Sequence, residues 1–160
     1  MTNDSTNVDV TGPVLALDLG EKQVGVAVSD NRLITIKRLQ KLKRTNWKQL
    51  LRDVQTLIEQ FDAKSVVIGL PLRLDGTVGS AAENVERLAG NFAKSLSIPV
   101  FLQDERLTSF EAREVILEAG RSHDEVAEYI DSESAALILR DFLNNPHDRS
   151  PLNERVDTTK

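Results

Sequence analysis

Cysteine is absent from this chain of 160 residues, and only two histidines are present. The absence excludes a disulfide framework and a cysteine-ligated zinc site, and the scarcity of histidine argues against an imidazole-rich metal centre. Any metal would therefore be a hard cation held by carboxylate oxygens. Aromatic residues make up only 4% of the chain, and the single tryptophan, Trp47, is expected to pack in the core and not to stack on a base.

Long apolar runs are missing as well. No segment approaches the ~20 apolar residues of a membrane-spanning helix, and no secretory apolar segment follows Met1. We therefore expect no membrane partner and a cytoplasmic protein. The composition is typical of one soluble globular domain. The polar residues 1–12 are expected to form a disordered tail, 13–144 a single domain, and 145–160 a flexible C-terminal tail.

The net charge of −5 conceals a basic segment. Residues 32–52 contain eight Lys or Arg residues and no Asp or Glu. Phosphate backbones are the commonest partner of such a patch on an acidic protein, although a solvated, lysine-rich surface is the alternative. We favour nucleic-acid binding, and the residues assigned to it here are Lys37, Arg38, Lys41, Lys43 and Arg44.

Hydrophobic periodicity predicts an α/β fold. Apolar runs indicate strands at residues 14–19, 24–29, 33–42, 64–70 and 100–104, with 33–42 carrying the charges of an edge strand and Asp30 in the turn before it. Helical periodicity indicates helices at 47–61, 80–96, 108–119, a short one after 122, and 131–143. Early hairpins followed by strand–helix alternation predict a mixed sheet covered by helices.

Asp18 interrupts the apolar run Val14–Leu19, and Gly20 follows two positions later. A carboxylate on the face of a buried strand is costly unless it is paired or binds a metal. The alternative is that Asp18 only caps the following turn with its side chain. This stretch alone supports the two interpretations equally.

Two further carboxylates could meet Asp18. Glu105 directly follows the strand at 100–104, and parallel strands place their carboxyl ends at one edge of an α/β sheet, where ligands bind. Asp131 opens the last predicted helix on its apolar stripe, although an N-cap role is the alternative. Three converging acids raise one another's pKa unless a cation neutralises them, so Mg²⁺ or Mn²⁺ is the expected cofactor. With the basic segment, the cluster predicts metal-dependent hydrolysis of nucleic acid.

Four segments resemble the YqgF family, also called the RuvX or Holliday-junction resolvase family, of the ribonuclease H-like superfamily. They are LALDLGEKQVGVAVSD (15–30), VVIGLPLRLDGT (66–77), DERLTSFEA (104–112) and DSESAALIL (131–139). The resemblance implies a five-stranded mixed sheet flanked by helices, and catalytic metal-ligand roles for Asp18, Glu105 and Asp131. It also implies phosphodiester hydrolysis, with maturation of the 5′ end of 16S ribosomal RNA as the favoured role and junction resolution as the alternative.

The resemblance places the loop Pro71–Gly79 beside the active site, which suits Arg73 as a phosphate contact. Lys22 and Arg106 are expected near the phosphates too. The chain departs from the family at Gln23, where an arginine or similar base is usual, and at Arg73-Leu74, where Asn-Met is usual. These departures alter substrate contacts and leave the three acids in place.

The expected partner is nucleic acid, with RNA favoured and branched DNA possible. Junction resolution would require two dyad-related sites, so the expected state is a monomer or a homodimer. A non-catalytic RNA-binding module is the alternative from another class, and it would bind nucleic acid regardless of metal. An ATPase-like domain would need a second domain, for which the chain offers no room, and the P-loop motif is missing.

Overall fold

A five-stranded mixed sheet forms the centre of the fold, as the sequence predicts. The computed structural model describes residues 10–72, 75, 77–105, 123–145 and 151–153, with the backbone alone for 123–132. The strand order is β3-β2-β1-β4-β5, in which β2 is antiparallel to β1 and β3, and β4 is parallel to β1 and β5. The strands are β1 (Val14–Leu19), β2 (Gln23–Ser29), β3 (Ile36–Lys43), β4 (Ser65–Leu70) and β5 (Val100–Asp104).

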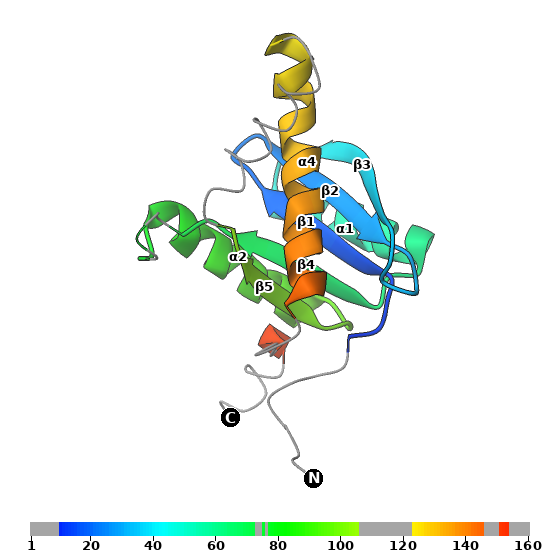
Figure 1. The fold of residues 1–160 in the computed structure, drawn as a ribbon. Coiled ribbons are helices and arrows are strands. Elements are labelled where there is room, and N and C mark those ends of the chain that lie inside the picture. The colour runs from blue at the N-terminus through cyan, green and yellow to red at the C-terminus, as the bar shows by residue number, and fades with distance from the viewer. Residues whose placement is uncertain (1–9, 73–74, 76, 106–122, 146–150, 154–160) are drawn as a thin grey trace.

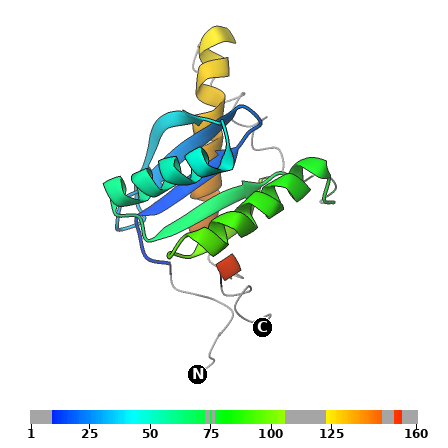
Figure 2. The same ribbon diagram turned by 180° about the vertical axis from the view of Figure 1, so that it is seen from behind.

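Helices cover both faces of the sheet (Figures 1 and 2). α4 (His123–Asn144) crosses one face, and α1 (Trp47–Phe61) and α2 (Ser80–Ser95) cover the other. Side chains alternate between the two faces along each strand, so β1 contributes to two separate cores. Val14 and Ala16 pack with the apolar side of α4, whereas Leu15 and Leu17 belong to the core beneath α1 and α2.

α1 begins and ends where the sequence predicts. Its apolar residues recur with a helical period, and Leu50 and Val54 are buried against the sheet. The side chain of Asn46 caps the helix by accepting a hydrogen bond of 2.9 Å from the backbone N–H of Gln49. Trp47 packs edge-to-face on Phe92 of α2, with ring centroids 4.8 Å apart, which confirms its core role.

β3 is an edge strand, as predicted, but it begins at Ile36 and not at Leu33. The reason is the turn at Asp30, whose Oδ1 accepts hydrogen bonds from the backbone N–H groups of Ile34 (2.7 Å) and Thr35 (3.1 Å). The bond from Ile34 holds the pKa of Asp30 below its usual value. Leu33 adopts a positive φ of 62° within this turn, so it cannot continue a strand.

α4 corrects the prediction of two separate helices in this region. The helix is continuous from His123 to Asn144, so Asp131 is an interior residue and neither opens the helix nor serves as its N-cap. The segment contains no proline or glycine that would interrupt it. Among the described residues, none of the helices is both long and apolar enough to cross a membrane. The helix predicted at 108–119 lies outside the described residues.

The C-terminal segment is not a free tail at Pro151–Asn153, contrary to expectation. The side chain of Asn153 accepts a hydrogen bond from the backbone N–H of Val100 (2.8 Å) and donates to the carbonyl oxygens of Ala93 (3.0 Å) and Ile98 (3.1 Å). Pro151 is buried. These contacts join the end of the described chain to the start of β5 and the end of α2.

Candidate active site at the carboxyl ends of the strands

Asp18 is the fifth residue of β1 and lies on the sheet face that α4 covers. Strand alternation places it on the same side as Val14 and Ala16, which pack in the core beneath α4. Its cross-strand partner in β2 is Gly25, which contributes no side chain beside the carboxylate. The turn that follows is closed by backbone bonds, in which the N–H of Gly20 donates to the carbonyl oxygens of Asp18 and Gln23. Asp18 is thus well placed to face a ligand on the α4 side.

Glu105 follows β5 directly and is fixed by the neighbouring strand. Its backbone N–H donates a 3.0 Å hydrogen bond to the carbonyl oxygen of Leu70, the last residue of β4. Its carboxyl group lies over Gly69, because a Cβ on that glycine would be 2.9 Å from Cδ of Glu105 and 3.0 Å from Oε2. The same Cβ would also collide with Cδ1 of Ile138 from α4. Only glycine at position 69 therefore lets Glu105 and α4 close over the sheet together.

The carboxyl group of Glu105 has a strongly raised pKa and a buried oxygen that makes no hydrogen bond to the described residues. Burial, followed by the charges of Asp18 and Asp104, raises the pKa of Glu105 to about 9. Its Oε2 is buried and has no hydrogen-bond partner among the described residues. A buried carboxyl group in this state is either protonated or neutralised by a cation. The orphaned oxygen, the glycine cradle and the second carboxylate of Asp18 together fit a hard divalent cation such as Mg²⁺.

The raised pKa predicts an inverse dependence of stability on pH for protein freed of metal by EDTA. Folded Glu105 keeps its proton up to pH of about 9, whereas the unfolded chain releases it near the ordinary value of 4.5. The folded state binds more protons in this interval, so Glu105 makes the melting temperature fall as the pH rises through it.

Thermal melts between pH 5 and pH 9 would measure this effect by comparing wild type with Glu105→Gln. The variant should lose less stability than wild type across the interval, because its amide cannot ionise. Parallel pH profiles of the two proteins would contradict the assignment. Added Mg²⁺ should stabilise wild type most at the alkaline end.

Asp131 is the third predicted acid, and the structure describes its backbone alone. It is the ninth residue of α4, on the same helical stripe as Ala135, Ile138 and Phe142, which pack on the sheet. Its side chain lies outside the described residues. Among the side chains that are described, no group of three acidic, histidine or cysteine residues forms a metal site. The structure thus brings Asp18 and Glu105 together, and the participation of Asp131 stays a prediction.

The predicted nucleic-acid contacts do not form one continuous face. Lys37 lies 6.0 Å from the ring centroid of Phe61 on the α1 side, whereas Arg38 forms an ion pair with Glu133 on the α4 side. Lys41 and Lys43 line a groove between β3 and α1. Arg44 donates a 2.7 Å hydrogen bond to the carbonyl oxygen of Gly20. Edge-strand alternation divides the basic segment between both sides of the sheet, which charge counting alone does not reveal.

The remaining predicted phosphate contacts are Lys22, Arg73 and Arg106. Lys22 is exposed in the turn between β1 and β2, four residues after Asp18. Arg44 stabilises that turn, because its backbone N–H also donates a hydrogen bond of 2.9 Å to the carbonyl oxygen of Lys22. Arg73 and Arg106 lie outside the described residues. Gly69 was not among the predicted site residues, although a glycine inside a buried strand signals the close approach of another group.

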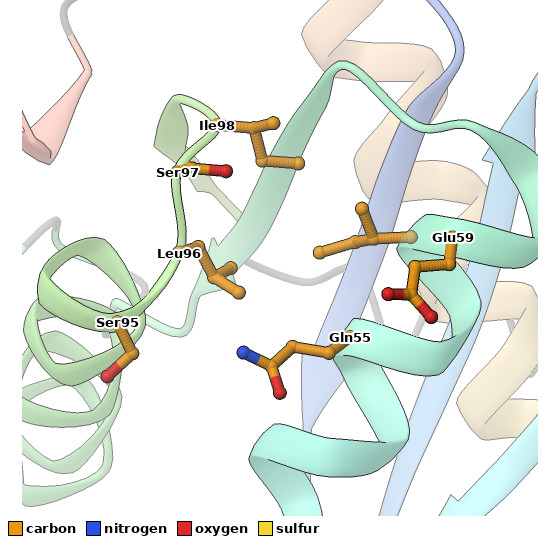
Figure 3. A pocket seen from close by; sticks show the side chains of 7 residues that line it. Gln55, Glu59, Ser95, Leu96, Ser97 and Ile98 are labelled. Atoms are coloured by element: carbon orange, nitrogen blue, oxygen red, sulfur yellow. The ribbon is translucent and has the colours of Figure 1, made fainter.

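A pocket of about 380 Å³ lies on the opposite side of the sheet (Figure 3). It is bounded by Gln55, Ile58 and Glu59 of α1 and by residues 95–98 at the end of α2. Its one acidic residue, Glu59, has no second carboxylate in the lining to share a cation. The carboxylate pair on the α4 side is therefore the better candidate for the chemistry.

The sequence profile of the RuvX family, described as Holliday junction resolvase, matches residues 12–145. The chain belongs to the RuvX family. Two relatives named "Putative pre-16S rRNA nuclease" are similar along most of their length. The one from Koribacter versatilis is 42% identical over 134 residues, covering 84% of this chain and 88% of the relative. The one from Synechococcus elongatus is 38% identical over 130 residues, covering 81% and 87%.

Solved structures establish the fold class of this RuvX-family chain. The Thermus thermophilus RuvC structure in complex with a Holliday junction substrate has a TM-score of 0.53 at 12% identity, covering 86% of this chain and 98% of RuvC. The fowlpox virus resolvase in complex with junction DNA has a TM-score of 0.52 at 14% identity, covering 83% and 97%. The predicted ribonuclease H-like fold is confirmed, and identities this low carry no further conclusion.

Proposed function

We propose that this RuvX-family chain is a nuclease that depends on a divalent metal, Mg²⁺ or Mn²⁺, and hydrolyses phosphodiester bonds in nucleic acid. The observation that carries the proposal is the Oε2 atom of Glu105, which has no hydrogen-bond partner among the described residues. Its carboxyl group is seated over Gly69, with Asp18 close enough to raise its pKa. Such a pair is expensive to bury without a cation. The names of the relatives and the family description support hydrolysis of nucleic acid.

Asp18, Glu105 and Asp131 are the residues that would hold the cation. When bound, it stabilises the negative charge that develops on the phosphate oxygens during hydrolysis. Glu105 would help to hold the cation and would orient the attacking water, whose proton passes to solvent as the new oxygen–phosphorus bond forms. The bond to the leaving oxygen breaks, and that oxygen takes a proton from solvent. Lys22 would face a substrate phosphate from the exposed turn, with Arg73 and Arg106 in similar roles.

The favoured role is processing of the 5′ end of pre-16S ribosomal RNA, in agreement with the names of the relatives. This role places the protein in the cytoplasm, where ribosomes mature. Resolution of Holliday junctions is the second candidate, favoured by the family description, and it would require two sites in a dimer. A non-catalytic RNA-binding module, the candidate from another class, would not account for the orphaned carboxyl group.

Cleavage of labelled RNA carrying a ribosomal precursor 5′ end tests the proposal. Reactions with Mg²⁺, Mn²⁺ or EDTA would run beside a four-way DNA junction, and light scattering would give the state of association. We expect metal-dependent cleavage of the RNA. Cleavage of the junction alone by a dimer would transfer the assignment to a resolvase, and binding without cleavage, insensitive to EDTA, would overturn the nuclease.

A further inference from the structure

An ion pair joins the edge strand β3 to α4 across 95 residues of sequence. The guanidinium of Arg38 donates two hydrogen bonds to the carboxylate of Glu133, from Nε to Oε1 and from Nη2 to Oε2, the second at 2.9 Å. The side chain of Glu133 is 10% exposed, whereas that of Arg38 is 51% exposed. Of the two charged groups, the carboxylate of Glu133 is thus the buried one, and Arg38 neutralises it from the edge strand β3.

The two-point geometry restrains more than distance. A planar guanidinium that donates two parallel hydrogen bonds fixes the orientation of the carboxylate as well as its position. The hydrogen bond with Glu133 also holds the pKa of Arg38 above its usual value, so the guanidinium keeps its charge. Because Glu133 is part of a helix, the pair fixes both the rotation of α4 about its axis and its position along that axis.

This restraint acts next to the predicted metal ligand on α4. Glu133 is the first residue of the helix whose side chain is described, two positions after Asp131. The aromatic contact of α4 with the sheet, Phe142 against Phe101 with ring centroids 5.2 Å apart, lies more than two turns away. Ile138, over Gly69, is more than one turn away. The pair with Arg38 is therefore the described side-chain contact of α4 that lies nearest to Asp131 along the helix, and it acts together with the packing of Ala135 on the sheet.

We propose that Arg38 is a positioning residue for the metal site and not a phosphate contact: through Glu133 it orients α4 so that Asp131 can share a cation with Asp18 and Glu105. The proposal rests on the proposed function. It also replaces the role that charge counting suggests for Arg38, since the edge of the guanidinium formed by Nε and Nη2 is committed to the carboxylate of Glu133.

Binding of Mn²⁺ by the substrate-free protein, measured by titration calorimetry, tests the proposal in Arg38→Gln and Arg38→Lys. Both variants should weaken Mn²⁺ binding, Arg38→Gln by about 10-fold or more, as for other groups that orient metal ligands. Arg38→Lys keeps the charge but loses the two-point geometry, so it should bind Mn²⁺ more weakly than wild type even where Arg38→Gln fails to fold. Lys64→Gln is the matched control, because it removes one positive charge from an exposed ion pair with Asp62, and it should bind Mn²⁺ as wild type does.

The salt dependence of RNA binding in EDTA separates positioning from phosphate contact. Loss of one phosphate contact lowers the slope of log K against log salt by about 0.7 for a single strand, whereas a positioning residue leaves the slope unchanged. An altered slope, or unchanged Mn²⁺ affinity in a folded Arg38→Lys protein, would overturn the inference while the nuclease assignment stands. Failure of wild type itself to bind Mn²⁺ would instead overturn the proposed function.

Discussion

Replacing Asp18 with Asn is expected to reduce metal-dependent cleavage by at least about 100-fold while the fold stays intact. Groups that merely orient a metal ligand already contribute about 10- to 100-fold, and Asp18 is proposed to bind the cation itself. The amide keeps the shape of the side chain on β1 but removes the charge that attracts a cation. Cleavage rates under saturating Mg²⁺ would measure the loss, and circular dichroism would verify the fold.

The same substitution should have the opposite effect on stability when metal is absent. The Asp18 carboxylate contributes to the raised pKa of Glu105, so its removal makes the ionised form of Glu105 less costly in the folded state. In EDTA at pH 8, Asp18→Asn should melt at or above the temperature of wild type. Asp53→Asn, an equivalent change at a half-buried position of α1 on the opposite side of the sheet, is the control and should leave cleavage unaffected. Wild-type activity in Asp18→Asn would refute the site.

Replacing Gly69 with Ala is expected to lower both the stability of the fold and the rate of cleavage. The new methyl group would lie 2.9 Å from Cδ of Glu105 and would collide with Cδ1 of Ile138. Overpacking of this kind costs about 1–3 kcal/mol of folding free energy. Displacement of the Glu105 carboxyl group should lower cleavage by about 100-fold, as misplacements of 1 Å can do. Urea unfolding and cleavage rates would measure the two losses separately.

A second substitution separates the two clashes at Gly69. Ile138→Val removes the Cδ1 atom, so Gly69→Ala combined with Ile138→Val should recover part of the stability but little of the activity, because the contact with Glu105 remains. Gly90→Ala is the control, since nothing lies within 4 Å of a Cβ at that helical position. It should raise stability by about 0.5–1 kcal/mol. Recovery of full activity in the double variant would show that the Glu105 contact is unimportant.

Most of the fold could be predicted from local patterns in the sequence. The helical stripe of α1 with its cap at Asn46, and the apolar runs of β1 and β4, depend on interactions within a few residues, which a sequence displays directly. The boundary at Asp131 failed because an aspartate near apolar periodicity is as compatible with a helix interior as with a helix start. Nothing local decided between them, and the structure has one continuous helix from His123 to Asn144.

The site was predicted less completely than the fold, for a physical reason. Asp18 and Glu105 could be paired because parallel strands bring their carboxyl ends to one edge. The role of Gly69 depends on how closely α4 approaches the sheet, and the pairing of Arg38 with Glu133 depends on which helix crosses the edge strand. Both are distances between elements remote in sequence, and composition or periodicity contains no measure of them.

The bond from Asn153 to Val100 also occupies part of the outer edge of the sheet. β5 is the outermost strand on its side of the sheet, and the outer N–H of such a strand is a template for a strand from another molecule. Asn153 already occupies that donor at Val100 with a side chain from the same chain. Asn153 therefore makes this N–H unavailable to a strand from another molecule, and its replacement would expose an unpaired donor on the strand that leads to Glu105.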